Sequence, residues 1–188
     1  MNNLSLEERK ILLILARDAI ELAANGAPPP HLVLTEYPPR LREPGASFVT
    51  LTVDGNLRGC IGTLDAHQPL VQDVYEHARA AAMQDYRFLP VKPDELDELF
   101  IEISCLSNPE PLIYRDPGEL IANLRPGVDG VVIRDGLRRA TFLPQVWDKI
   151  PDPETFLAHL CLKLGGPEDL WKRTKLDVLL YQVEEFHE

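Results

Sequence analysis

The segment Leu57–Thr63, which reads LRGCIGT, contains the residues of this chain that are best suited to chemistry. Cys60 carries a thiol, and Arg58 lies two positions before it. In a β-strand such residues point to one side, roughly 6.5–7 Å apart given a rise of ~3.3 Å per residue. A guanidinium at that distance stabilises a thiolate and lowers the pKa of a thiol. We therefore expect Cys60 to be a nucleophile or redox thiol that Arg58 assists.

Gly59 and Gly62 flank the cysteine, and glycines in a strand need a reason because they weaken it. A β-bulge, or another group approaching the backbone closely, would supply one. In the functional interpretation, the two glycines open a small pocket around a reactive thiol. In the structural interpretation, they serve packing, and Cys60 is a buried, inert cysteine of the kind that protein cores often contain. The sequence leaves both interpretations open.

A reactive thiol needs a partner that handles its proton, and three side chains are candidates. Glu102 lies on the polar side of an expected strand, Arg87 follows an expected helix, and His67 follows Cys60 in the chain. A carboxylate or an imidazole can take the thiol proton, and an arginine can bind an anionic substrate. The alternative for each candidate is an ordinary solvated or ion-paired surface charge.

The other cysteines, and several motifs that do not occur, reduce the number of reaction classes that the sequence supports. Cys105 and Cys161 occupy apolar positions of an expected strand and helix, so we predict that both are buried. No CxxC pair and no metal-type histidine spacing occurs, and we predict neither a metal nor a cofactor. Phosphate-loop, GxGxxG, HExxH and GxSxG motifs do not occur either. Gln145 and Trp147, just after another expected strand, could line a ligand pocket, although a core position is the alternative for the tryptophan.

Charge and hydropathy exclude further classes. The chain has 188 residues, with 19 Lys and Arg against 30 Asp and Glu, and a net charge of −11. An acidic protein without a basic stripe is a poor ligand for nucleic acid or for an anionic membrane, so we expect neither as a partner. Acidic Glu7 and Glu8 precede the first apolar stretch, which is unlike an export signal. We therefore expect a cytoplasmic protein with reduced thiols.

Hydrophobic periodicity predicts which elements position these side chains. Expected helices cover residues 5–24, 69–84, 117–124 and 154–164, and expected strands cover residues 48–53, 57–61, 99–106, 131–134, 137–143 and 175–185. Ser5 and Glu8 have the spacing of a capping box. Two Asp-Gly turns predict β-hairpins, which indicate either an internal duplication or a coincidence of common turns. The fold class is α+β, with antiparallel or mixed sheet built from hairpins and packed helices.

A series of short motifs, in order along the chain, resembles one family. The motifs are LRGCIG at 57–62, DYRF at 85–88, IEIS at 101–104, GVDG at 127–130 and FLPQVW at 142–147. With them, the chain resembles the AmmeMemoRadiSam system protein A family, the AMMECR-type domain proteins, from the first helix to about Phe186. The chain departs from the family pattern at Tyr86, where proline is usual, and at 163–166, where the family usually has a Lys-Ala-Gly-Leu type sequence.

The resemblance implies one α+β domain over residues 1–188, with a larger and a smaller lobe and a cleft near residues 57–63. It also implies a Memo-like protein and a radical SAM protein as partners, but it supplies no reaction. Two functions remain. The protein is an enzyme or accessory enzyme that uses Cys60 with Arg58, Glu102 or Arg87, or it is a non-catalytic adaptor whose docking surface is Leu57–Gly62.

Overall fold

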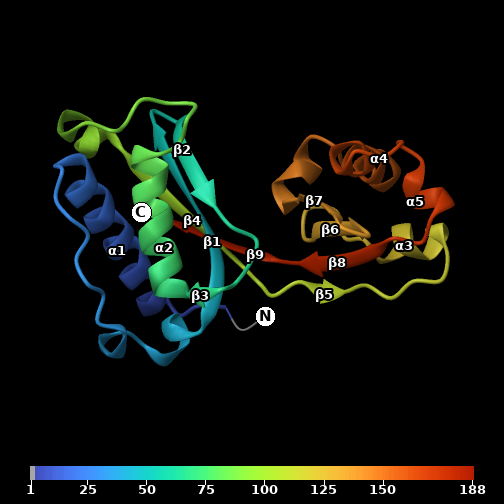
Figure 1. The fold of residues 1–188 in the computed structure, drawn as a ribbon, viewed down its shortest axis with the longest axis horizontal. Coiled ribbons are helices and arrows are strands. Elements are labelled where there is room, and N and C mark those ends of the chain that lie inside the picture. The colour runs from blue at the N-terminus through green and yellow to red at the C-terminus, as the bar shows by residue number, and fades with distance from the viewer. Residues whose placement is uncertain (1–2) are drawn as a thin grey trace. The chain divides into compact units, whose positions relative to one another are not determined.

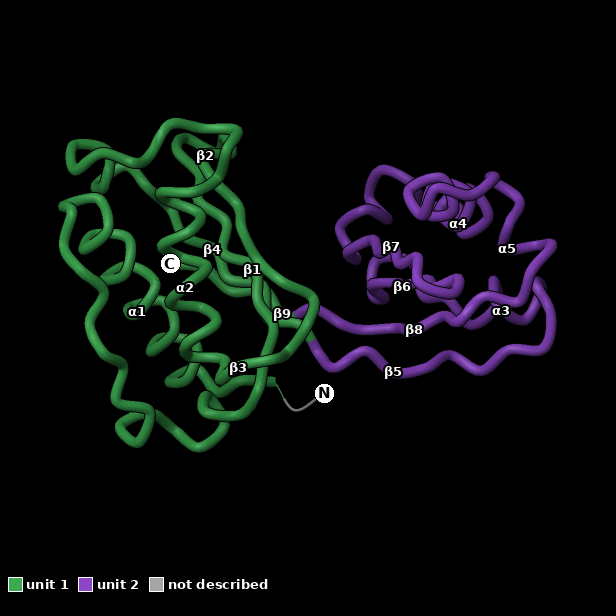
Figure 2. The backbone as a smooth tube through the Cα atoms, in the orientation of Figure 1, with its two compact units in different colours: residues 1–106, 184–188 green, residues 107–183 purple. Residues whose placement is uncertain are grey.

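The computed structural model describes residues 3–188, which form two compact units. Unit 1 comprises the chain up to Leu106 together with Glu184–Glu188, and unit 2 comprises Ser107–Val183 (Figure 2). Each unit has its own antiparallel sheet and its own hydrophobic core. The expected α+β class, with sheets built from hairpins and packed helices, is confirmed.

Unit 1 consists of a sheet with two long helices on one side (Figure 1). Its helices are α1 (Leu6–Ala24) and α2 (Leu70–Met83), its 3-10 turns are η1 (Leu34–Glu36), η2 (Pro39–Arg42) and η3 (Pro93–Glu98), and its strands are β1 (Pro44–Val53), β2 (Asn56–Gly62), β3 (Gln68–Pro69), β4 (Phe100–Leu106) and β9 (Val183–His187). The strand order is β2-β1-β4-β9, and β3 pairs with β1.

The two helices bury apolar stripes against the sheet. The predicted capping box starts α1, because Ser5 accepts from the backbone of Glu8 while the Glu8 carboxylate accepts from that of Ser5. The buried stripe of α1 contains the residues that the periodicity predicts, which are Leu12, Leu15, Ala16, Ala19, Ile20 and Ala23. These residues form one core with α2 and with the sheet. Burial of this apolar surface is the main force that holds unit 1 together.

Strand alternation gives the sheet of unit 1 two different faces. Val49 and Leu51 of β1, and Ile101 and Ile103 of β4, are fully buried in the core with the helices. Their neighbours in sequence therefore point to the opposite face. Both long helices of unit 1, α1 and α2, lie on the core side of the sheet (Figure 1). We refer to the opposite side as the open face.

Unit 2 is a smaller sheet with its own helices. Its elements are β5 (Glu110–Pro111), α3 (Pro117–Asn123), β6 (Gly130–Asp135), β7 (Arg138–Phe142), η4 (Pro144–Asp148), α4 (Pro153–Leu164), α5 (Leu170–Arg173) and β8 (Asp177–Tyr181). The strand order is β5-β8-β6-β7, and the pairings are antiparallel. The core contains Trp147, whose ring stacks on Phe156 with centroids 3.6 Å apart.

One predicted element is wrong in its extent. The single strand expected over 175–185 is two strands, β8 and β9, that belong to different sheets. They are separated at Gln182, whose backbone makes no ladder pairing there. Its N–H donates to the Ser107 hydroxyl at 2.9 Å, and its carbonyl accepts from the Ser107 N–H at 2.9 Å. Ser107, which follows β4, thus satisfies both backbone polar groups of Gln182, which lies between β8 and β9.

The two Asp-Gly hairpins differ in their turns. Between β1 and β2 the turn residues are Asp54 and Gly55, and both have positive φ, at 50° and 75°. Between β6 and β7 the last pair is Asp135 with Arg138, so Gly136 with φ 60° opens the turn. The Asp-Gly sequence is therefore shifted by one position relative to the turn. The similarity of the two segments does not extend to their geometry.

Within the described residues, the structure has no helix with both the length and the apolar character needed to cross a membrane.

Candidate functional site

The strand that carries the predicted site, β2, lies at the edge of the sheet and contains a β-bulge. Leu51 of β1 pairs with Gly59, but the next residue, Thr52, pairs with Leu57. Arg58 is therefore the extra residue, without a partner in β1. A bulge turns a side chain away from the direction that simple alternation gives it.

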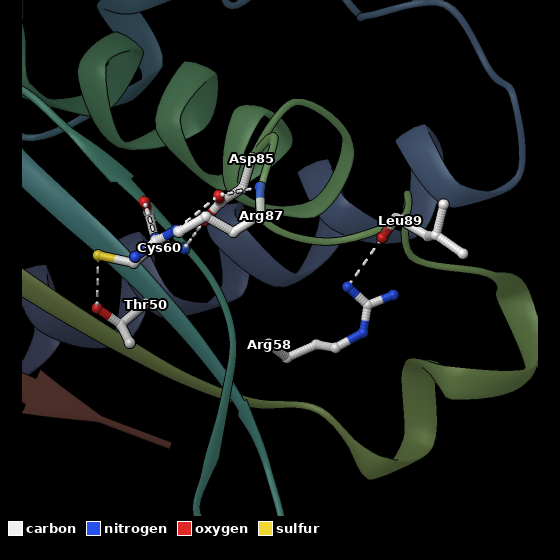
Figure 3. Close-up of polar contacts among 6 residues, drawn as sticks. All are labelled: Thr50, Arg58, Cys60, Asp85, Arg87 and Leu89. Atoms are coloured by element: carbon white, nitrogen blue, oxygen red, sulfur yellow. Dashed lines mark hydrogen bonds and ion pairs between the residues drawn. The ribbon is translucent and has the colours of Figure 1, made fainter.

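The side chain of Arg58 is bound by the loop after α2 and by η3. Its Nε and Nη2 donate to the Glu95 carboxylate at 2.8 and 3.1 Å, and its Nη1 donates to the Leu89 carbonyl at 2.9 Å. This hydrogen bonding is also the main reason that the pKa of Glu95 is lowered. Figure 3 shows the guanidinium directed at Leu89, away from the sulfur of Cys60. The expected pairing of Arg58 with the thiol is thus replaced by an ion pair with Glu95.

The backbone of Cys60 is held by a buried carboxylate and an arginine (Figure 3). The Cys60 N–H donates to Asp85 Oδ2 at 2.9 Å, and its carbonyl accepts from Arg87 Nη2 at 3.2 Å. Arg87 also donates to both oxygens of Asp85, at 2.9 and 2.6 Å. These bonds satisfy backbone groups that an edge strand would otherwise leave unpaired.

The charges of this pair are mutually stabilised. Arg87 hydrogen-bonds Asp85 and holds the pKa of that carboxyl well below its usual range. In turn, hydrogen bonding to Asp85 raises the pKa of Arg87. Arg87 therefore stabilises the position of the strand around Cys60. Its guanidinium already donates hydrogen bonds to Asp85 and to the Cys60 carbonyl. Sequence reasoning proposed Arg87 but missed Asp85, although both lie in the DYRF motif.

The two glycines of the segment are required by close approaches. A Cβ on Gly59 would lie 2.2 Å from the backbone oxygen of Ala81 in α2. A Cβ on Gly62 would lie 2.4 Å from the ring of Phe48 and 2.4 Å from the backbone oxygen of Ser47. The absence of a side chain at Gly59 thus lets α2 pack directly against β2, and the ring of Phe48 packs directly on Gly62. Close packing therefore accounts for both glycines.

The sulfur of Cys60 lies on the open face, in a row of side chains that crosses the sheet. Thr50 of β1 is the register partner of both Cys60 and Glu102 of β4. Directly opposed residues of antiparallel strands point to one face, where their side chains meet. The Thr50 hydroxyl donates to the Cys60 sulfur at 3.3 Å. We call Cys60, Thr50 and Glu102 the thiol row.

Glu102 is a titratable group with an altered affinity for protons. Burial raises its pKa, and the negative charge of Glu185 on β9 and a hydrogen bond to that residue raise it further. Two adjacent carboxyl groups hold a proton between them more readily than either does alone. The thiol row together with Glu185 therefore comprises a thiol, a hydroxyl and a carboxyl pair. Sequence reasoning proposed Cys60 and Glu102 and missed Thr50 and Glu185.

The other proposed site residues are not members of this row. His67 is exposed, and its Nδ1 lies 2.8 Å from the Asp65 carbonyl in its own loop. Gln145 and Trp147 belong to η4 in unit 2. Trp147 is 2% exposed and donates from Nε1 to the Asp129 carbonyl at 2.7 Å, so it is a core residue. Gln145 is exposed.

The three cysteines differ in accessibility. Cys105 and Cys161 are buried, as predicted, and burial raises the pKa of each thiol. Cys60 is half-buried. Within residues 3–188, no group of three or more His, Cys, Asp or Glu side chains is arranged to hold a metal ion. The side chains of the thiol row are a thiol, a hydroxyl and a carboxyl group.

Comparison with known proteins places the chain among archaeal relatives. A protein of Methanothermobacter thermautotrophicus is 40% identical over 190 residues, which cover 98% of this chain and 96% of the relative. A protein of Methanocaldococcus jannaschii is 36% identical over 195 residues, which cover 100% and 94%. The crystal structure of an uncharacterized protein from Pyrococcus horikoshii superimposes with a TM-score of 0.81 at 36% identity, over 97% of this chain and 92% of that one. The AMMECR1 family matches residues 13–186, and the chain belongs to that family.

Proposed function

We propose that this AMMECR1-family protein is an enzyme or accessory enzyme whose nucleophile is Cys60. One observation carries the proposal: a half-buried thiol, a hydroxyl that donates to its sulfur and a carboxyl of raised pKa occupy neighbouring strands of one sheet face. A thiol of this kind reacts only where it stays reduced, and the cytoplasm provides that condition.

The groups of the thiol row can support a nucleophilic displacement by the Cys60 sulfur. Cys60 and Glu102 lie on either side of Thr50, so a bridging water takes the thiol proton and passes a proton on to an ionised carboxylate of the Glu102–Glu185 pair. The Thr50 hydroxyl donates to the negative charge that develops on sulfur. The sulfur electron pair forms a bond to an electrophilic substrate carbon. The bond from that carbon to its leaving group breaks, and the carboxyl pair returns the proton to the leaving group. Water or a nucleophilic acceptor then attacks the carbonyl carbon of the new thioester, the carbon–sulfur bond breaks, and the proton that the attacking group loses returns to the sulfur.

A nucleophilic role agrees with the cysteine positions better than a dithiol redox role. Cys105 lies in the helix-side core of unit 1, and Cys161 lies in the core of unit 2. Neither is placed as a resolving thiol on the open face. The substrate class that this face can take is a small electrophilic molecule, including an intermediate supplied by a radical SAM protein.

Selective alkylation tests the thiol row. With iodoacetamide and mass spectrometry on the folded protein, Cys60 should label while buried Cys105 and Cys161 stay unlabelled. Thr50→Val removes the hydroxyl at nearly constant volume and should slow Cys60 labelling about fivefold, the equivalent of one hydrogen bond of about 1 kcal/mol. Thr52→Val is the matched control, because Thr52 lies on the same face of β1 but pairs with Leu57 and Phe100. Its labelling rate should equal that of the wild type.

The pH profile of the same reaction tests the carboxyl. Because the pKa of Glu102 is raised, its ionisation should appear as an inflection of the labelling rate above the usual range for glutamate. Glu102→Gln keeps the shape of the side chain and should remove that inflection. If Cys60 stays unlabelled up to pH ~8.5, the reference value for a free thiol, the nucleophile proposal is wrong.

A second candidate function is that of an adaptor that docks on the Leu57–Gly62 segment. The observation that favours it is a group of exposed apolar side chains on or beside this segment. Tyr86 is 94% exposed, Leu89 is 79% exposed and Leu57 is 43% exposed. Leu89 is joined to the segment by the hydrogen bond from Arg58. Such side chains are typical of protein interfaces, and a Memo-like protein or a radical SAM protein is the partner we propose.

Binding to purified partners separates the two functions. An adaptor should lose binding to the Memo-like or radical SAM protein of the same genome in Leu89→Asp, and should keep it in Cys60→Ser. An enzyme should lose its reaction in Cys60→Ser whatever happens to binding. Ile113→Asp is the matched control, since Ile113 is also exposed, at 82%, but belongs to unit 2.

A further inference from the structure

A second region of unit 1, built from other residues than the thiol row, contains a cavity of about 610 Å³. One wall is a face of α2, and the other wall is formed by residues 29–34 of the connector that follows α1. Cavities of this size hold metabolite-sized molecules. The connector contributes prolines, leucines and His31, whereas α2 contributes mainly polar and charged side chains, which include the Glu76 carboxylate as well as Arg79.

Two polar groups in the wall of this cavity are buried without a hydrogen-bond partner. The hydroxyl of Tyr75 and the Nη1 of Arg79 have no partner among the described residues, and Tyr75 is only 5% exposed. The Arg79 guanidinium lies over the Tyr75 ring, 5.9 Å from its centroid. A buried donor without a partner costs free energy, and more so when it is charged, so native proteins rarely contain one without a purpose.

The acidic side chains next to Arg79 are engaged elsewhere. Glu76 accepts from two glutamine amides, at 3.0 Å from Gln68 and at 3.1 Å from Gln72. Asp73 is fully buried and pairs with His77 Nδ1 at 3.1 Å. Within residues 3–188, no carboxylate forms an ion pair with Arg79. Arg79 therefore gives the cavity wall a positive charge that no carboxylate of the described residues pairs with, and the buried Arg79 Nη1 and Tyr75 hydroxyl keep unused capacity to donate.

We propose that this cavity binds a small organic anion whose carboxylate or phosphate pairs with the Arg79 guanidinium. Side-chain rotation on binding brings Arg79 Nη1 and the Tyr75 hydroxyl, which are buried in the free protein, into hydrogen-bond contact with the anion. Charge-assisted bonds of this kind are among the strongest that a protein forms with an anion. The apolar part of the ligand packs against Leu32 and Leu34 of the connector, which line the same cavity. The site is separate from Cys60, and it stands whether or not the thiol proposal holds.

Titration with simple aromatic anions, followed by NMR of backbone amides, tests the site. Benzoate and phenyl phosphate carry the two oxyanions on the same ring, and benzamide is the neutral counterpart of benzoate. We expect saturable shifts of the amides of Leu32, Tyr75 and Ala80 with at least one anion and none with benzamide. The tighter of the two anions identifies the headgroup class. Arg79→Gln should weaken binding at least about tenfold, the loss expected when a charged partner becomes neutral.

The control is Arg42→Gln, which removes an exposed arginine of unit 1 outside the cavity and should leave binding unchanged. Two outcomes would overturn the proposal. The first is an absence of saturable shifts at cavity amides with both anions up to about 20 mM, well above the dissociation constant of a weak specific site. The second is equal affinity in the wild type and in Arg79→Gln, which would mean that the cavity holds only water or apolar probes.

A stability measurement without any ligand tests the same point independently. If the Tyr75 hydroxyl has no partner in the free protein, Tyr75→Phe should leave the melting temperature unchanged or raise it, because a buried donor is removed. The same variant should weaken anion binding. A melting temperature clearly below that of the wild type would show that the hydroxyl is already bonded, and would contradict the proposed role.

Discussion

Gly59→Ala should destabilise unit 1 by about 3 kcal/mol or more, one of the largest effects expected for a single methyl group. The added Cβ would lie 2.2 Å from the oxygen and 3.1 Å from the carbon of Ala81. Both atoms belong to the backbone of α2, so no side-chain rotation relieves the overlap. Either the helix must move away from β2 or the strand must leave the sheet, and each movement opens the core that they share.

The comparison with Gly55→Ala separates crowding from backbone strain. Gly55 has φ 75° in the turn between β1 and β2, but a Cβ there meets nothing within 4 Å. Alanine in the left-handed region costs about 1–2 kcal/mol, so Gly55→Ala should be the milder variant. If the two variants lose equal stability, the close contact between α2 and β2 is not the reason for Gly59.

Chemical denaturation with two probes shows where the loss occurs. Both tryptophans, Trp147 and Trp171, belong to unit 2, so their fluorescence follows that unit. Far-ultraviolet circular dichroism also reports α1 and α2 of unit 1. In Gly59→Ala the dichroism transition should move to a lower denaturant concentration, and its midpoint difference from the wild type gives the change in free energy.

The sequence identified the segment around Cys60 as unusual, but it could not say why the glycines are there. Alternation predicts that Gly59 and Gly62 lie on opposite faces of the strand. The distance from Gly59 to Ala81, however, depends on how closely α2 packs on the sheet. That distance is a tertiary property and leaves no local pattern. The bulge at Arg58 is likewise decided by the register with β1, so the redirected guanidinium was not predictable from spacing alone.

For Glu102, in contrast, the sequence pattern was enough to predict the direction of the side chain. The alternation of β4 predicts that it points away from the apolar side, and the structure places it on the open face. Its role in a row with Cys60 needed the pairing of both strands with β1, which no local pattern specifies. The last strands show a similar limit. The apolar residues of 175–185 fit one strand, and only the bonds of Gln182 to Ser107 reveal the change of sheet.

Asp85→Ala should lower the free energy of unfolding by about 2–3 kcal/mol, because it removes the acceptor of the Cys60 N–H and the partner of Arg87. The effect is smaller than for a fully buried ion pair, since the Arg87 side chain is 43% exposed and can be hydrated. Asp85→Asn keeps an oxygen that can accept from Cys60 and should lose only about half as much. Denaturation midpoints of the three proteins at neutral pH measure both steps.

The pH dependence of these differences identifies the ionised form of Asp85 as the stabilising one. Arg87 holds the pKa of Asp85 in the folded protein far below the value of about 3.9 that an unfolded aspartate has. For a lowered folded pKa, the contribution is complete above the unfolded pKa and is lost as the pH falls toward the folded one. The advantage of the wild type over Asp85→Asn should therefore shrink by about 1.4 kcal/mol per pH unit below pH ~4. An advantage that stays constant between about pH 4 and pH 2.5 would mean that Asp85 stabilises β2 through shape and neutral hydrogen bonding, and not through its charge.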